Sequence, residues 1–169
     1  MWLYNFRNFL ALTLLCLVLV SCGFRPLHTP IGCDYTTSYP IKIATISDRY
    51  GQILRNSLVD LLTPEGTPCK PKYILEIKLT ELIIDTGTAK DETTKRKQVT
   101  LTADLILRNA KYDIVYKHTV SAINSFPIIQ ENYYANTIAE VFSKKEGLIL
   151  LAQKIKVLIS TYLEDHGEN

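Results

Sequence analysis

Three stretches of alternating apolar and polar residues follow one another in the middle of the chain, with no helical pattern between them. They span residues 72–80, 98–107 and 112–122, and the run Leu75-Glu76-Ile77-Lys78-Leu79 is typical of them. A period of two indicates strands that bury one face. Strands that follow one another through short links pair as an antiparallel meander. The chain must therefore build a sheet with one apolar face, and that face needs a cover.

Two helical patterns can supply this cover. Residues 48–62 carry apolar side chains at helical spacing after two N-cap candidates, Ser47 and Asp48, and the sequence TPEG at residues 63–66 ends the pattern. Residues 137–163 predict a long second helix, in which Gly147 costs about 1 kcal/mol relative to alanine and predicts a kink or a weaker first half. A short β-branched stretch at residues 40–45 predicts one further strand.

The fold class follows from this order of elements. The order β-α-β-β-β-α, with one apolar face on each element, predicts an α+β two-layer sandwich. We expect a four-stranded, mostly antiparallel sheet with two helices on one face, in a single domain over residues 40–164 that is followed by a frayed tail over residues 165–169. The alternation breaks at residues 82–84 and predicts a bulge or twist there. Residues 85–97 predict a polar link, and residues 125–136 an irregular segment.

The first 22 residues indicate a targeting segment rather than a part of the fold. One cation, Arg7, precedes an apolar run over residues 10–20, which is too short to span a membrane and suits a secretory signal. The run ends in Leu19-Val20-Ser21-Cys22, which resembles the lipobox of bacterial lipoproteins. This resemblance implies that residues 1–21 are removed, that Cys22 is lipidated and that residues 22–39 form a tether. An ordinary signal peptide that ends by chance in cysteine is the alternative.

Two further cysteines remain in the mature chain, Cys33 and Cys69, because Cys16 leaves with the signal. The periplasm favours disulfides. A bridge between Cys33 and Cys69 is therefore expected, and a pair of unbridged thiols is the alternative. A metal site is disfavoured, because the chain has no C-x-x-C motif and its three histidines are scattered.

The sequence contains none of the common catalytic or cofactor-binding motifs, such as a P-loop, G-x-S-x-G or H-E-x-x-H. His118 falls on the inward register of its strand, which favours a hydrogen-bonded core histidine over a general base. Removal of Arg7 leaves 18 Lys and Arg against 17 Asp and Glu, too balanced for a nucleic-acid binder. We therefore expect a protein that is not an enzyme, needs no cofactor and binds no nucleic acid.

A group of cations surrounds the expected tip of the first hairpin. It comprises Lys90, Lys95, Arg96 and Lys97, with acidic residues and threonines between them. Lysine and arginine side chains that are exposed at a tip bind phosphorylated sugars at little desolvation cost. The alternative is a solvated loop whose charges discourage pairing between sheet edges.

Several stretches resemble one known family. The sequence CGFRPL at residues 22–27 is similar to the mature start of the lipopolysaccharide-assembly lipoproteins, the LptE family. Residues 46–58 (ISDRYGQILRNSL) resemble the first helix of that family, and residues 134–140 resemble the entry to its last helix. His28 stands where the family often has tyrosine. The chain length and the order of elements also agree, so the resemblance covers essentially the whole mature chain.

This resemblance implies a lipoprotein without enzyme activity on the periplasmic side of the outer membrane, held there through its N-terminal lipid. Gly23 after the lipidated cysteine, where aspartate would retain a protein at the inner membrane, agrees with this location by the same resemblance. The family implies a domain that plugs and helps to assemble a large β-barrel, LptD, and that contacts lipopolysaccharide. We assign Lys90, Lys95, Arg96 and Lys97 to that contact by position and charge alone. A periplasmic scaffold for another envelope complex and an envelope enzyme built around His118 are the alternatives.

Overall fold

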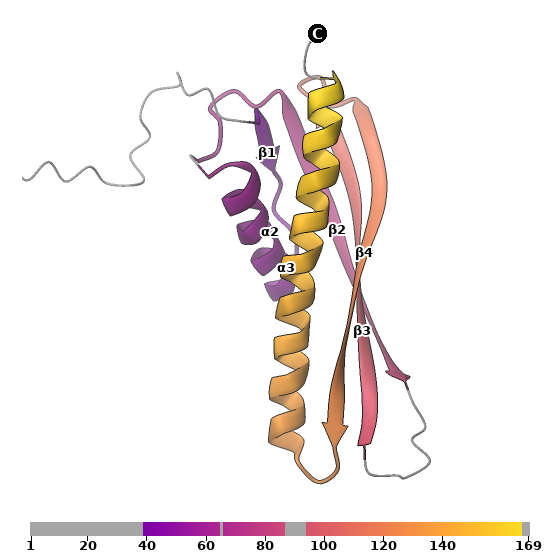
Figure 1. Cartoon of the computed structure of the whole chain (residues 1–169). Helices are drawn as coiled ribbons and strands as arrows, with labels where there is room; N and C mark the ends of the chain where they lie inside the picture. Colours follow the sequence, from indigo (N-terminus) through magenta and orange to yellow (C-terminus); the bar gives the residue numbers. More distant parts are fainter. Residues whose placement is uncertain (1–38, 65, 87–93, 167–169) are drawn as a thin grey trace, which may run out of the picture. The chain divides into compact units, whose positions relative to one another are not determined.

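A four-stranded sheet carries two helices in the computed structural model, which describes residues 39–64, 66–86 and 94–166 (Figure 1). All of these residues belong to one unit, Cys33–Asn169. The elements are β1 (Ile41–Ile43), α2 (Asp48–Leu62), β2 (Tyr73–Thr86), β3 (Thr94–Asn109), β4 (Ile114–Ile129) and α3 (Tyr133–His166). The strands lie in the order β1-β2-β3-β4, with β1 parallel to β2 and the other neighbours antiparallel. The predicted fold class and order of elements are confirmed.

The core lies between the helices and one face of the sheet. The register places Leu75 opposite Leu107 and Ile77 opposite Leu105, and all four side chains are buried. The helices contribute the fully buried residues Leu54, Leu58, Leu148, Leu151, Ile155 and Ile159. Each such leucine or isoleucine contributes roughly 1.5–3 kcal/mol through burial. The two predicted periodicities therefore meet in a single core.

Gly147 lies where α3 packs against Leu101 of β3. A Cβ atom built on Gly147 would lie 2.9 Å from Leu101 Cδ1, and both residues are buried. The helix continues through this position from Tyr133 to His166. Packing against Leu101 explains the glycine, because a larger residue would push the helix away from the sheet.

We expect Gly147→Leu to destabilise the domain by about 3 kcal/mol, the upper end for overpacking a core. Urea unfolding of the wild-type and variant domains would measure this difference. Glu146→Leu is the matched control, because residue 146 is exposed on the same helix and should shift stability by less than about 0.5 kcal/mol. Equal losses in both variants would contradict the packing explanation.

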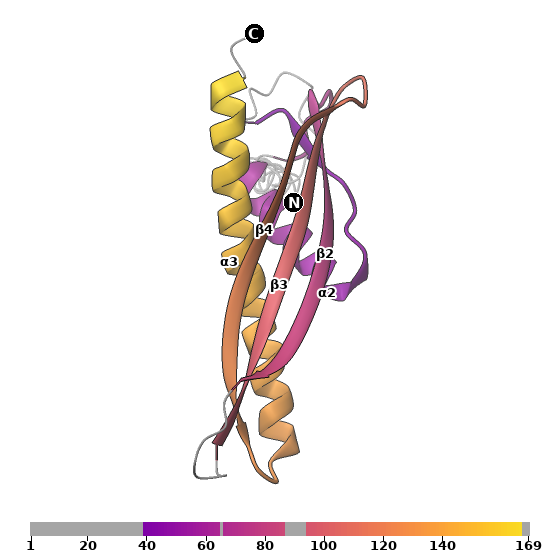
Figure 2. The same cartoon turned by 90° about the vertical axis from the view of Figure 1, so that its right-hand side faces the viewer.

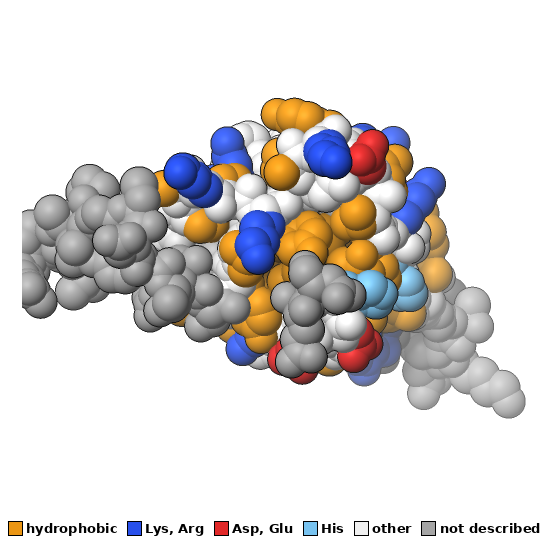
Figure 3. Space-filling model, turned by 90° about the horizontal axis from the view of Figure 1, so that it is seen from above, with side chains coloured by type: hydrophobic (Ala, Val, Ile, Leu, Met, Phe, Trp, Pro, Cys, Tyr) orange, Lys and Arg blue, Asp and Glu red, His pale blue; other side chains and the backbone are white. Residues whose placement is uncertain are grey.

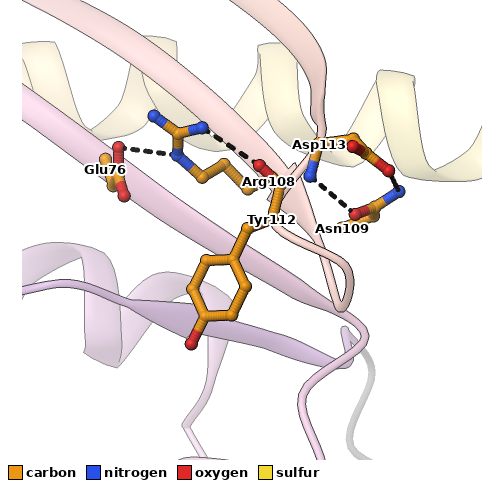
Figure 4. A network of polar contacts seen from close by, with 5 residues as sticks. All are labelled: Glu76, Arg108, Asn109, Tyr112 and Asp113. Carbon is orange, nitrogen blue, oxygen red and sulfur yellow. Dashed lines mark hydrogen bonds and ion pairs between the residues drawn. The ribbon is translucent and has the colours of Figure 1, made fainter.

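The third strand of the meander begins later than predicted. The alternation over residues 112–122 places Tyr112 and Ile114 on the apolar face of the strand, but they are 69% and 55% exposed. Tyr112 lies in a turn with a φ of 66°, where the Asn109 side chain accepts hydrogen bonds from the backbone N–H groups of Lys111 and Asp113 (Figure 4). A register shift between residues 107 and 108 then changes the phase of the pairing. The turn and the register shift together explain why Tyr112 and Ile114 do not lie in the core.

Residues 125–136 are not irregular, which corrects the prediction for that segment. β4 continues to Ile129 and α3 begins at Tyr133. Phe126 is buried on the helix-facing side of the sheet. Pro127 follows it without breaking the strand, because β4 is an outer strand, and an outer strand has a side without a neighbour where no N–H is needed.

The predicted bulge at residues 82–84 is also absent. β2 pairs with β3 without a register shift from Tyr73 to Thr86. Ile83 therefore points toward the helices, while Leu82 and Ile84 point to the opposite face, where they are 57% and 40% exposed. The break in the sequence pattern reflects apolar residues on both faces of one regular strand.

Candidate functional site

One face of the sheet carries neither helix, and Figure 2 looks onto it. The register aligns its side chains in rows across β2, β3 and β4. One row joins Leu82, Thr100 and Ile123, and its two aliphatic side chains are 57% and 58% exposed. The second row beyond it contains Thr119, whose Oγ1 donates to Asp104 Oδ1 at 2.7 Å. We call this mixed surface of hydroxyl, charged and aliphatic side chains the open face.

The predicted cations do not form one surface in the described part of the chain. Lys95, Arg96 and Lys97 lie on β3 rather than in a loop, so alternation places Arg96 on the open face and the two lysines on the helix-facing side. Arg96 Nη2 donates to Ser125 Oγ at 3.1 Å, and Lys97 Nζ lies 3.9 Å from Asp85 Oδ1. Lys90 lies outside the described residues. Arg96 and the two lysines therefore present their charges on opposite faces of the sheet.

His118 is exposed, which corrects the prediction of a core histidine. It does occupy the helix-facing register, opposite Leu105, but β4 is the outer strand and the helices do not cover it there. The described residues contain no group of three or more His, Cys, Asp or Glu that could hold a metal ion.

A stack of aromatic rings joins β4 to the end of α3. Tyr162 contacts Tyr116 at 4.7 Å and stacks on His166 at 4.4 Å between ring centroids, and His118 stacks on Tyr116 at 6.0 Å. The Tyr162 hydroxyl donates to the Val115 carbonyl at 3.2 Å, and burial raises the pKa of this tyrosine. Figure 3 looks onto this end, where hydrophobic side chains gather beside histidine. The stack fixes the last turns of α3 on the sheet.

Polar contacts of Arg108 join the β3–β4 turn to β2. Arg108 Nε donates to Glu76 Oε2 at 3.0 Å, and Arg108 Nη1 donates to the Tyr112 carbonyl at 3.1 Å (Figure 4). Glu76 lies on the open face of β2. Its pairing with Arg108 braces β2 against the turn and leaves the Tyr112 side chain exposed.

A lysine-centred network, which the sequence reasoning missed, links β2 to α3. Lys144 Nζ lies 2.6 Å from Glu81 Oε1 and 2.7 Å from Glu140 Oε1, with the Tyr50 ring centroid at 5.3 Å. Burial alone lowers the pKa of Lys144, but the hydrogen bonds to Glu140 and Glu81 outweigh it, so the net pKa is raised. The i,i+4 spacing of Glu140 and Lys144 was the available signal. Glu81, on the helix-facing register, completes the network.

The remaining predicted sites fall outside what the structure describes. Cys22, the lipid site, and Cys33, one half of the expected disulfide, lie among the residues that are not described. Cys69 is exposed after α2. The lipid attachment and the bridge therefore stay predictions. Within the described ranges, no helix is both long enough and apolar enough to cross a membrane.

Comparison with known proteins places the fold among bacterial lipoproteins. No family model matches the chain, and no curated protein matches its sequence. A minor lipoprotein from Acinetobacter baumannii has a similar structure, with a TM-score of 0.62, 16% identity and coverage of 73% of this chain and 92% of the other. Lipoprotein B from Nitrosomonas europaea has a TM-score of 0.56 and 13% identity, and the match covers 82% of this chain and 97% of the other. Rare lipoprotein B from Shewanella oneidensis has a TM-score of 0.51 and 9% identity, and the match covers 75% of this chain and 98% of the other. The chain thus has a fold that Gram-negative lipoproteins adopt.

Proposed function

We propose that the chain is an outer-membrane lipoprotein, anchored on the periplasmic side through a lipid on Cys22. Its domain would occupy the lumen of an LptD-type β-barrel, help to assemble that barrel and contact lipopolysaccharide in transit to the cell surface. The role requires no catalytic group, metal or cofactor. The lipobox and the CGFRPL sequence of residues 22–27 support the anchor and the family.

The observation that carries this proposal is the open face. A plug inside a barrel must present a surface that tolerates a polar lumen. The open face mixes threonines, serines and a Lys78–Asp104–Thr119 row with the aliphatic row of Leu82 and Ile123. Non-obligate interfaces are about as apolar as ordinary protein surface, so such a mixture suits a partner that encloses the domain.

Purification from membranes tests the proposal directly. A C-terminal tag, mild detergent and mass spectrometry should recover a large β-barrel in equal amount with the lipoprotein. Thr100→Asp and Ile123→Asp, placed together in one row of the open face, should reduce recovery of the barrel at least tenfold, because two buried charges without partners cost several kcal/mol. Thermal unfolding would show that the domain remains folded.

Recovery of the lipoprotein alone, or with a different envelope complex, would contradict the barrel proposal. The second of these outcomes would favour the scaffold alternative. Lys111→Asp, in the exposed turn between β3 and β4, is the matched control and should leave the recovery unchanged.

The cations at the start of β3 carry the expected contact with lipopolysaccharide. Replacing Lys95, Arg96 and Lys97 together with alanine should weaken binding of purified lipopolysaccharide about tenfold, since three exposed charge contacts contribute roughly 0.5 kcal/mol each. Barrel recovery should not change. Fluorescence titration with lipopolysaccharide at fixed salt would measure the loss.

The alternation of these cations allows a sharper comparison. Arg96→Ala removes the cation on the open face, and Lys95→Ala with Lys97→Ala removes those on the helix-facing side. A loss confined to one variant would assign the ligand to one face. Unchanged binding in the triple variant would mean that Lys95, Arg96 and Lys97 are solvated charges at the end of the strand and do not contact lipopolysaccharide.

A further inference from the structure

The two outer edges of the sheet are protected very differently. β1 pairs only with Tyr73–Leu75, so among the described residues no strand lies on the side of residues 76–86 of β2 that faces away from β3. β4 forms the other outer edge over its full length, Ile114–Ile129. Figure 2 shows α3 alongside β4, and it shows no strand beside the lower half of β2 on the side away from β3. An exposed strand edge is a template for another strand, and proteins normally block it.

The edge of β4 is blocked by side chains from α3. The helix places polar groups on the carbonyl or N–H groups of three residues spread along the strand. The contacts are the Tyr162 hydroxyl on Val115 O at 3.2 Å, Lys154 Nζ on Ser121 O at 2.9 Å, and the Asn136 amide on Ile129 N and O at 2.9 and 2.8 Å. Side chains of α3 therefore occupy four backbone groups at both ends and near the middle of this edge.

The edge of β2 has no such cover. The Leu75 carbonyl accepts a hydrogen bond from Ala44 N–H at 2.9 Å, so the backbone groups of Leu75 point away from β3. Backbone groups alternate along a strand. The same side is therefore presented by Ile77, Leu79, Glu81, Ile83 and Asp85. Within residues 39–64, 66–86 and 94–166, no strand or side chain forms a hydrogen bond with these groups.

We infer that residues 77–85 of β2 receive an extended segment of a partner protein as an added strand. A row of alternating N–H and C=O groups in the plane of a sheet is matched along its whole length by another extended polypeptide. The side chains beside this edge agree with such a partner. Leu82 and Ile84 are exposed on the open face and would pack against apolar residues at alternate positions of the incoming strand.

A second copy of this chain fits the edge poorly. A two-fold antiparallel pairing that uses the whole of residues 77–85 must centre on residue 81. It would place Glu81 directly opposite Glu81 of the second copy and Asp85 opposite Ile77. Like charges directly opposite one another destabilise a strand pair. The segment therefore belongs to a different protein.

This inference deepens the proposed function, because the barrel protein is the first candidate to supply the segment, but it rests on the edge itself. The test uses the full lipoprotein in its own cells, with a photo-crosslinking amino acid at Thr80, which is exposed on the open face of β2. Ile83→Pro removes one edge N–H without touching the ladder to β3, and outer strands tolerate such a proline. Ile83→Ala removes the side chain and keeps the N–H.

We expect Thr80 to crosslink to a short extended segment of one partner, identified by mass spectrometry of the joined peptides. The yield should fall at least tenfold in Ile83→Pro and less than twofold in Ile83→Ala. A crosslinker at Thr119, exposed on β4, is the control, because its yield should not depend on the proline. Asp85→Pro and Asp85→Ala form a second matched pair at an exposed side chain, and thermal unfolding of each variant establishes folding.

Three results would overturn the inference: no adduct at Thr80, an adduct with a second copy of the chain, or equal losses in the proline and alanine variants. The inference and the proposed function can also fail separately. Recovery of the barrel without a proline-sensitive adduct would leave the function and remove the added strand. A proline-sensitive adduct with an unrelated protein would support the added strand and contradict the proposed function.

Discussion

Cys22→Ala should yield an N-terminal region without acyl chains, and an overproduced protein that fractionates with soluble periplasmic contents rather than with membranes. Each buried CH₂ of an acyl chain contributes about 0.8 kcal/mol, so one chain anchors marginally and several anchor stably. If Cys22 carries the lipid, as we propose, its loss removes every chain at once. Intact-mass measurement reads the modification directly, and overproduction above the level of any membrane partner keeps that partner from retaining the variant.

Cys16→Ala is the matched control for this experiment. Cys16 lies inside the apolar run that precedes the lipobox, and alanine preserves the apolar character of the run. Processing, mass and membrane fractionation should therefore equal those of the wild type. Retention of acyl mass in Cys22→Ala would mean that the lipid is attached elsewhere. An unmodified wild-type protein cleaved near residue 22 would establish the ordinary signal peptide.

The elements that sequence could predict are those in which one side chain in two, or one helical face, is apolar. β2, β3 and both helices satisfy this rule. The order of elements and the single core could be predicted from these four elements. The errors lie where one residue serves two purposes. Leu82 and Ile84 are apolar on an exposed face, and their presence imitates a bulge. His118 has the inward register but lies on the outer strand, where its side chain is exposed.

The candidate sites were less predictable, because they depend on distances between segments far apart in the chain. Alternation on β3 separates Arg96 from Lys95 and Lys97, although the three are adjacent in sequence. Gly147 was interpreted by its helix propensity, whereas its role is set by Leu101 on another element. The edge of β2 that no other described strand pairs with becomes visible only once β1 is seen to end at Ile43.

Lys144→Met should lower the free energy of unfolding by about 2 kcal/mol, the largest effect we expect from a single charged residue of the domain. Breaking a fully buried pair costs roughly 3–5 kcal/mol. The cost here is smaller because the Glu81 and Glu140 side chains are 28% and 35% exposed and stay partly hydrated. The Lys144 side chain itself is only 11% exposed. Urea unfolding at neutral pH would measure the loss.

The same network predicts a pH dependence with a definite sign. Hydrogen bonds to Glu140 and Glu81 raise the pKa of Lys144 above its ordinary value of 10.5 in spite of burial. A raised pKa in the folded state stabilises the protein fully below the unfolded value, and this contribution is lost as the pH rises through the folded pKa. The stability difference between wild type and Lys144→Met should therefore be constant from pH 7 to 9 and shrink above about pH 10.5.

Lys145→Met separates this network from a general effect of removing a lysine from α3. Residue 145 is exposed, so its loss should change stability by less than about 0.5 kcal/mol at any pH. If Lys144→Met proved as stable as wild type, methionine packing would be compensating fully for the ion pairs, as happens at some buried pairs. A Glu81→Gln, Lys144→Met double-mutant cycle would then decide whether the link from β2 to α3 holds the helix, because only a direct interaction gives a coupling energy. A coupling near zero would leave the core around Gly147 and Leu101 as the main attachment of α3 to the sheet.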